Sequence, residues 1–228
     1  MESVLRVKNL IVDFGDERVL ENLSFEVAEN ETIVIIGPNG AGKTVLLKTL
    51  LGLVPHQGIV EWRPGVKIGY VPQGLPLIKD IPLSIREFLR LGKVSDLEIS
   101  EIMEDIGMGK ALLSRSIGNL SSGQFQRVLI GLGLLGNPQV LLFDEPTTGI
   151  DIGGEETIYN LLERLRVERH LTTILVSHDL SIVYKFAARV ICLSKQAICM
   201  GSPREVLTSE MLARLYGGEV KFYQHGSH

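Results

Sequence analysis

The sequence contains one glycine-rich segment whose residue types could hold phosphate groups. The segment reads Gly37-Pro38-Asn39-Gly40-Ala41-Gly42-Lys43-Thr44. It follows an apolar stretch typical of a strand, Thr32–Ile36, and precedes a stretch with helical spacing that reaches Leu51. Glycines let backbone N–H groups approach a phosphate, and the N-terminus of a helix favours negative charge. The strand before and the helix after argue against a chance glycine-rich turn and predict a nucleotide site, in which Lys43 reaches the β- and γ-phosphates and Thr44 binds Mg²⁺.

Two further apolar segments also end in polar residues that could act on a nucleotide. Val140–Phe143 is followed by Asp144 and Glu145, and Thr172–Val176 is followed by Ser177 and His178. Asp144 suits the Mg²⁺ shell because hard cations prefer oxygen ligands, and Glu145 suits the base that orients the attacking water. His178 can donate a hydrogen bond to the γ-phosphate. Solvated acids and a structural histidine are the alternatives, and each would be preferred if the chain had no phosphate loop.

A second candidate anion site lies just before the predicted helix Phe125–Leu135. The segment reads Leu120-Ser121-Ser122-Gly123-Gln124. A serine and small residues at a helix N-terminus can hold an anion, although a plain helix cap is the alternative. One chain needs only one site for the γ-phosphate, so a second one suggests that it serves the nucleotide of another subunit.

The elements that must position these residues alternate between strand and helix. Strands are predicted over Val4–Val12, Leu23–Val27, Thr32–Ile36, Gly58–Trp62 and Val66–Val71. From about 84 to 118 the apolar residues recur at helical spacing, which predicts a helical subdomain inserted into a sheet. Beyond Gly123, helices and strands alternate, which is typical of a parallel sheet in an α/β fold. Ligands of such a sheet bind beyond the carboxyl ends of its strands.

Composition excludes several other classes of protein. The 228 residues are 45% hydrophobic and 22% charged, as expected for one large domain with a core of its own. The net charge of -4 argues against nucleic acid as the main partner. The N-terminus lacks the pattern of a secretory signal, and Val128–Phe143 is too short and too interrupted by glycine and proline to span a membrane. We therefore expect a cytosolic protein that reaches a membrane only through a partner.

The two cysteines, Cys192 and Cys199, are too few for a disulfide framework and indicate a reducing compartment. They fall in two consecutive predicted strands that turn near residues 194–196. We expect them to be small core residues rather than metal ligands.

Taken together and in this order, the motifs resemble those of the ABC ATPases, over essentially the whole chain. The resemblance implies ATP and Mg²⁺ as cofactors, an ATP-dependent homodimer, and a P-loop NTPase fold. In that fold a mainly parallel sheet core carries an antiparallel β subdomain and an inserted helical subdomain. We expect a single domain, 1–228, with the catalytic core at about 1–83 and 136–228 and the helical subdomain at about 84–135.

The resemblance also assigns roles to individual positions. The segment Tyr70-Val71-Pro72-Gln73 resembles the Q-loop, in which Gln73 senses the metal and the γ-phosphate. Asp144–Asp151 resembles the second Walker motif running into the D-loop, with Asp151 at the subunit contact. Phe14 stands where the family places an aromatic residue on adenine, with a core phenylalanine as the alternative.

Two positions depart from the family pattern. Ser122 replaces the usual glycine of the signature, and Val45 stands where the family often has a hydroxyl that touches the α-phosphate. Neither change removes a catalytic group.

Within the family, the chain most resembles the ATPase subunits of zinc and manganese importers. The similar stretches are Ile68–Gln73, Gly149–Gly154, Ala197–Gly201 and Leu215–Gly218. This resemblance implies permease subunits in the membrane, a metal-binding protein outside, and a location at the cytoplasmic face of the membrane. One alternative is the ATPase subunit of an ABC transporter with another cargo, such as an iron chelate. The other is a soluble ABC ATPase without a permease.

Two other segments bear on partners and on metal. The segment from Gln73 to Arg86 would meet the permease through its apolar residues, with an ordinary core as the alternative. These residues are Leu75, Leu77, Ile78, Ile81 and Leu83. In the C-terminal tail, His225 and His228 could bind metal weakly, although a flexible terminus is the other interpretation.

Overall fold

The computed structural model describes residues 2–73, 82–147, 150 and 152–217. The chain divides into two compact units. Unit one comprises residues 1–5, 27–32 and 62–176, and unit two comprises residues 6–26, 33–61 and 177–228.

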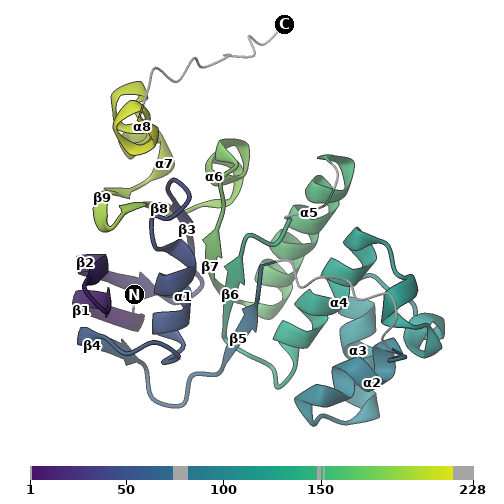
Figure 1. The fold of residues 1–228 in the computed structure, drawn as a ribbon. Coiled ribbons are helices and arrows are strands. Elements are labelled where there is room, and N and C mark those ends of the chain that lie inside the picture. Colours follow the sequence, from purple (N-terminus) through teal and green to yellow (C-terminus); the bar gives the residue numbers. More distant parts are fainter. Residues whose placement is uncertain (1, 74–81, 148–149, 151, 218–228) are drawn as a thin grey trace, which may run out of the picture. The chain divides into compact units, whose positions relative to one another are not determined.

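The core of unit one is a set of parallel strands with helices beside them (Figure 1). The strands are β5 (Ile68–Val71), β6 (Val140–Asp144) and β7 (Thr172–Val176). β6 pairs in parallel with both of the others, so Phe143 lies between Val71 and Leu175. Every residue of β6 and β7 is buried, as expected of parallel strands that are covered on both faces. The longest helix, α5 (Ile152–Arg169), leads into β7.

The chain segment that connects β5 to β6 in unit one is mostly helical. They are α2 (Ile85–Leu89), η1 (Arg90–Gly92), α3 (Asp96–Asp105), η2 (Lys110–Ser114), η3 (Ile117–Asn119) and α4 (Ser122–Leu134). Ser84, Ser95 and Ser121 start α2, α3 and α4, and each side chain accepts a hydrogen bond from a backbone N–H of the first turn. Phe88 and Phe125 join α2 to α4, with their ring centroids 6.2 Å apart. The helical character predicted for this part of the chain is confirmed.

Unit two contains most of a small sheet in the order β2-β1-β4. Its strands are β1 (Ser3–Phe14), β2 (Glu17–Ala28) and β4 (Gln57–Trp62). A turn of two residues joins β1 to β2, so these strands form an antiparallel hairpin.

The rest of unit two is built around β3 (Thr32–Ile36), which is buried throughout and pairs in parallel with β8 (Arg189–Ser194). β8 continues into the antiparallel strand β9 (Gln196–Gly201). The helices of this unit are α1 (Lys43–Leu50), α6 (Leu180–Phe186), α7 (Pro203–Val206) and α8 (Ser209–Tyr216). The predicted α/β fold, with mainly parallel strands and an antiparallel β part, is confirmed.

The cysteines require a correction, because Cys192 and Cys199 are joined by a disulfide. The two residues face each other across the β8–β9 pair, with their Cα atoms 4.9 Å apart, a separation that a disulfide can bridge. They are core residues as expected, but the prediction missed that a hairpin turning at 194–196 places them opposite each other.

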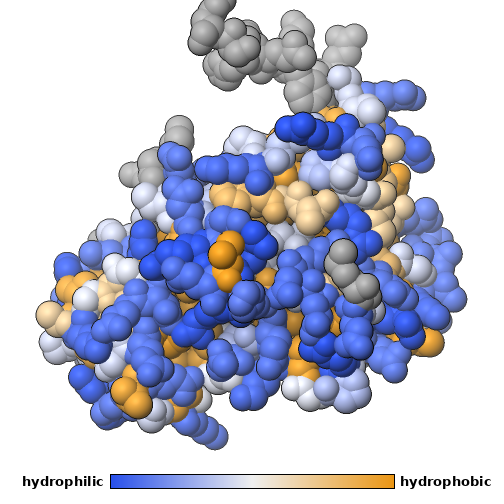
Figure 2. Space-filling view, turned by 180° about the vertical axis from the view of Figure 1, so that it is seen from behind, coloured by the Kyte–Doolittle hydropathy of each residue, from blue (hydrophilic) through white to orange (hydrophobic). Residues whose placement is uncertain are grey.

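The described residues include no helix long and apolar enough to cross a membrane. The face shown in Figure 2 is mostly hydrophilic, and its hydrophobic residues lie in small groups, as is normal for a protein surface.

Candidate functional site

The phosphate loop lies in unit two, between the buried strand β3 and the start of α1. Gly42 is the N-cap of α1 and has a left-handed backbone, with φ of 93°. A Cβ at Gly42 would lie 2.7 Å from the Leu20 side chain, and a Cβ at Gly37 would collide with the carbonyl oxygen of Leu193. Glycine is therefore required at both positions by the fold of this chain itself.

Positive charge and N–H groups gather at this loop. Lys43 is only 7% exposed, and its Nζ donates to the carbonyl oxygens of Gly37 (2.9 Å) and Pro38 (3.1 Å). The N-cap of α1 is Gly42, which has no side chain to cap the helix, and the N-terminus of a helix favours a negatively charged group. Asn39 and Gly40 are exposed at the tip. The loop therefore has the chemistry of an anion site.

The C-terminal part of unit two supports this loop. The Lys195 N–H donates to the Ala41 carbonyl (3.4 Å), and the Lys195 carbonyl accepts from the Glu21 N–H (2.8 Å). The backbone of Gly37 forms a hydrogen bond with Tyr216 at the end of α8, while burial raises the pKa of this tyrosine. These supports were not predicted from the sequence. The signal that could have revealed them is the parallel pairing of β3 with β8, which sets Ile36 beside Cys192.

In unit one, a buried carboxylate ends β6. Asp144 is 1% exposed, and the hydroxyl of Tyr70 on β5 donates to its Oδ2 at 3.5 Å. Burial raises the pKa of Tyr70 to about 12, and the charge of Asp144 adds to this rise. Tyr70 is therefore a neutral donor beside Asp144, a role that its place in the Q-loop motif did not predict.

Glu145, the next residue, has a left-handed backbone with φ of 47°. This conformation is uncommon for a residue other than glycine, and such strain is concentrated at functional sites. The Gln73 amide donates to Glu145 Oε2 at 2.9 Å, and the Glu145 N–H donates to the Val176 carbonyl at 3.2 Å. The structure thus brings together Gln73 and Glu145, two residues that sequence analysis placed in one site.

The serine-rich turn before α4 is also in unit one. The Ser121 hydroxyl accepts from the Gln124 N–H, and the Gln124 side chain accepts from the Ser121 N–H, both at 3.2 Å. Ser121 is therefore a helix cap, as the alternative reading had it, but its O–H can still donate to a further group. Ser121 and Ser122 are exposed, and a Cβ at Gly123 would have no atom within 4 Å. This open space would suit a ligand or a second chain.

The remaining residues predicted from the sequence differ in how exposed they are. Phe14 ends β1 with 52% of its surface exposed, so the alternative of a core residue is wrong. His178 is exposed between β7 and α6, and Thr44 and Val45 are half-buried in the first turn of α1. Asp151 lies outside the described residues. So do four of the five apolar residues expected to meet a permease, Leu75, Leu77, Ile78 and Ile81.

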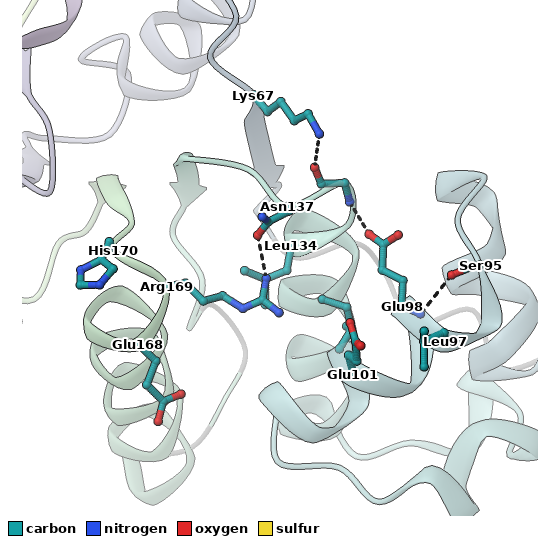
Figure 3. A pocket seen from close by; sticks show the side chains of 12 residues that line it. Lys67, Ser95, Leu97, Glu98, Glu101, Leu134, Asn137, Glu168, Arg169 and His170 are labelled. Carbon is teal, nitrogen blue, oxygen red and sulfur yellow. Dashed lines mark hydrogen bonds between the residues drawn. The ribbon is translucent and has the colours of Figure 1, made fainter.

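A separate cavity of about 660 Å³ in unit one is lined by none of these residues (Figure 3). The Lys67 ammonium donates to the Gly136 carbonyl (3.0 Å), and the Gly136 N–H donates to Glu98 of α3 (2.7 Å). Arg169 of α5 donates to the Asn137 side chain at 3.3 Å. These bonds engage Lys67 and Arg169 and tie α3 and α5 to the turn after α4, which indicates a structural role.

Comparisons with known proteins identify a matching family, similar sequences and a similar structure. The family described as ABC transporter matches residues 20–148. The chain is 39% identical to the zinc import ATP-binding protein ZnuC of Magnetococcus marinus, over 100% of this chain and 89% of the relative. It is 37% identical to ZnuC of Photorhabdus laumondii, over 99% of this chain and 90% of the relative. A solved structure, the ADP conformation of an ATP-binding cassette of an ABC transporter, is similar with a TM-score of 0.84 and 25% identity, over 96% of this chain and 100% of that one.

Proposed function

Since this chain belongs to the ABC transporter family, we propose that it is the ATP-hydrolysing subunit that powers the import of a divalent metal ion, zinc, through a separate permease. The observation that carries this proposal is the similarity to zinc import ATP-binding proteins over the full length of the chain. The phosphate loop and the residues at the end of β6 would supply the chemistry that such a subunit needs.

In unit two, the phosphate loop would bind ATP. Lys43 and the N–H groups of Gly37–Val45 would hold the phosphates, and Phe14 would stack on adenine, for which its exposed ring is suited. His178 would donate to the γ-phosphate. These groups position the nucleotide without making or breaking a bond to it.

From the resemblance we assign Mg²⁺ to the side-chain oxygens of Thr44, Gln73 and Asp144, because this cation prefers oxygen ligands. Of these three residues, Asp144 would supply a charged oxygen, from its buried carboxylate. When bound, Mg²⁺ neutralises charge on the β- and γ-phosphate oxygens. Glu145 would then orient the attacking water and accept its proton, and the Gln73 amide fixes the position of that carboxylate.

A second copy of the chain would complete each site. Ser121–Gln124 of one chain would face the γ-phosphate bound by its partner, and Asp151 would lie at the contact between the two subunits. The exposed serines and the open space at Gly123 support this assignment. ATP would then act as part of the interface of a homodimer.

The transport path would be supplied by other chains. We expect permease subunits to dock on the segment from Gln73 to Arg86 and a metal-binding protein outside the membrane to deliver the ion. The subunit would then work at the cytoplasmic face of the membrane, with no role for nucleic acid.

Elemental analysis of a deletion strain tests the cargo. Cells that lack this protein should lose zinc, grow poorly under chelation and recover when zinc is added. The wild-type gene should restore zinc content, whereas Glu145→Gln, which keeps the fold but lacks the base, should not. A loss of manganese alone would make manganese the cargo. Normal zinc and manganese with depleted iron would overturn the proposal in favour of an iron-chelate importer.

A further inference from the structure

The β8–β9 hairpin carries a disulfide that the proposed function does not use. Cys192 and Cys199 are directly opposed in the strand pair, and their sulfur atoms are bonded. Cys192 is fully buried, and Cys199 is 9% exposed. The structure therefore contains a cross-strand bond in which Cys199 is the more exposed residue.

The same hairpin touches the phosphate loop immediately beyond this bond. The register of the strand pair shifts between Cys192 and Leu193, so the regular pairing is interrupted there. The Leu193 carbonyl packs against Gly37, and the Lys195 N–H donates to the Ala41 carbonyl. The disulfide thus fixes the hairpin one residue away from the first group that contacts the loop.

We propose that the Cys192–Cys199 pair is a redox modification site that controls how firmly the hairpin holds the phosphate loop. With the bond closed, the two strands cannot separate beside the register shift. With the bond open, hydrogen bonds and packing hold the strands there without a covalent link, so the hairpin opens locally more often. Opening would release the Leu193 and Lys195 contacts with the loop and weaken nucleotide binding.

The chemistry is thiol–disulfide exchange with a small dithiol. One thiolate of the dithiol attacks Sγ of Cys199, forms a mixed disulfide and displaces Cys192 as a thiolate, which takes up a proton. The second thiolate of the reagent attacks its own sulfur in the mixed disulfide and releases Cys199, which is protonated in turn. The protein gains two electrons and two protons, and the dithiol becomes a cyclic disulfide. A low-molecular-weight disulfide reverses the reaction.

The test compares the two redox forms of the unaltered chain. Protein treated with oxidised glutathione, a low-molecular-weight disulfide, or with reduced dithiothreitol is freed of reagent, and its mass shows whether the bond is closed, because the closed form is lighter by two hydrogen atoms. ATP affinity is then measured by equilibrium titration. We expect the closed form to bind ATP roughly threefold to tenfold more tightly. Its amide hydrogens in Gly37–Ala41 and in the hairpin should also exchange more slowly.

The double variant Cys192→Ala/Cys199→Ala is the matched control, and its affinity should not respond to either reagent. If this variant does not fold, the two forms of the unaltered protein decide the matter alone. Equal affinity, within twofold, in forms whose masses prove them closed and open would overturn the proposal, as would a bond that never forms under the oxidant. Because ATP titration does not depend on cargo, neither result bears on zinc import.

Discussion

Two turns of this chain, each rich in small residues, precede a helix, and the two turns differ in the residues that contact them. The phosphate loop, residues 37–44, is supported by the Leu193 carbonyl, by Lys195 and by its own buried lysine. In the turn at 121–124, Ser121 and Ser122 are exposed, and the side-chain hydrogen bonds that the described residues show there join Ser121 to Gln124. The first turn has its groups in place within one chain, whereas the second has exposed serines, which we propose act on the nucleotide of a partner chain.

The glycines of the two turns show the same contrast. At Gly37 and Gly42 a side chain would collide with the chain's own atoms. At Gly123 a Cβ would meet nothing within 4 Å, so the fold of the single chain does not require glycine there. A requirement at Gly123 would therefore have to come from a ligand or from a second copy of the chain.

The largest effect should come from the first turn. Lys43→Ala removes the buried ammonium, and because hydrogen bonds to a charged group contribute about 1.5–3 kcal/mol each, ATP affinity should fall by roughly 100-fold or more. Lys48→Ala, an exposed lysine on the same helix, is the control and should bind normally. Near-normal ATP affinity of the Lys43 variant in an equilibrium titration would contradict the assignment of this loop.

Glu145→Gln should separate binding from turnover. The amide cannot accept the proton of the water, so hydrolysis should fall by about 100- to 10,000-fold while ATP still binds. With ATP and Mg²⁺ the stalled variant should shift from monomer to dimer in light scattering, because the two turns then close on the same nucleotides. Glu156→Gln, an exposed residue of α5, should hydrolyse ATP normally. A mass that stays monomeric at saturating ATP would count against the pairing of the two turns.

The second turn can be blocked without touching the first. Ser121→Arg should leave ATP binding to the single chain intact and lower hydrolysis by roughly 100-fold, because a bulky side chain would occupy the place of the partner's γ-phosphate. The control is Ser95→Arg, which likewise removes an exposed serine cap, that of α3. Both variants lose a helix cap, so similar rates in the two would mean that Ser121 acts only through the helix.

The smallest expected effect concerns the hydrogen bond from Tyr70 to Asp144. Tyr70→Phe removes the donor at Oδ2, a change of about 0.5–1.5 kcal/mol, so the Mg²⁺ concentration for half-maximal hydrolysis should shift by roughly twofold to tenfold. Tyr184→Phe, which removes a hydroxyl bonded to a backbone carbonyl, should leave it unchanged. No shift in the Tyr70 variant would mean that this hydroxyl does not tune the metal site.

Tyr70→Phe should also change how the stability of the protein depends on pH. The pKa of Tyr70 is raised in the fold to about 12, so the unfolded chain releases this proton first as pH rises. The contribution of Tyr70 to stability is therefore complete below pH 10 and is lost as pH rises towards 12. Denaturant titrations should show that the stability difference between wild type and Tyr70→Phe shrinks over this interval, and a constant difference would contradict the shift.

The features that sequence predicts here depend on local patterns. The apolar runs of β3, β6 and β7, the glycine spacing of the phosphate loop and the serine cap of α4 are each visible within a few residues. The resemblance to ABC ATPases placed Gln73 and Glu145 in one nucleotide site, and the hydrogen bond between their side chains agrees with it.

Two of the features that sequence missed depend on strand pairing between distant segments of the chain. Tyr70 reaches Asp144 because of the register of β5 with β6, and Leu193 reaches Gly37 because β3 pairs with β8. The left-handed backbone of Glu145 has no signal in its residue type, since glycine and asparagine are the residues that typically adopt it. Cys192 and Cys199 could have been paired from the hairpin, but only if the turn had been placed to the residue.

ATP hydrolysis by a mixture of two inactive variants tests the central claim most directly. Ser121→Arg keeps its phosphate loop, and Lys43→Ala keeps its serine turn, so a mixed dimer contains one complete site if the two turns act between chains. An equal mixture should then recover about a quarter of the wild-type rate, because half of the dimers are mixed and each has one of two sites intact. If both turns serve a nucleotide within the same chain, the mixture will be as inactive as either variant alone, and that result would contradict the account.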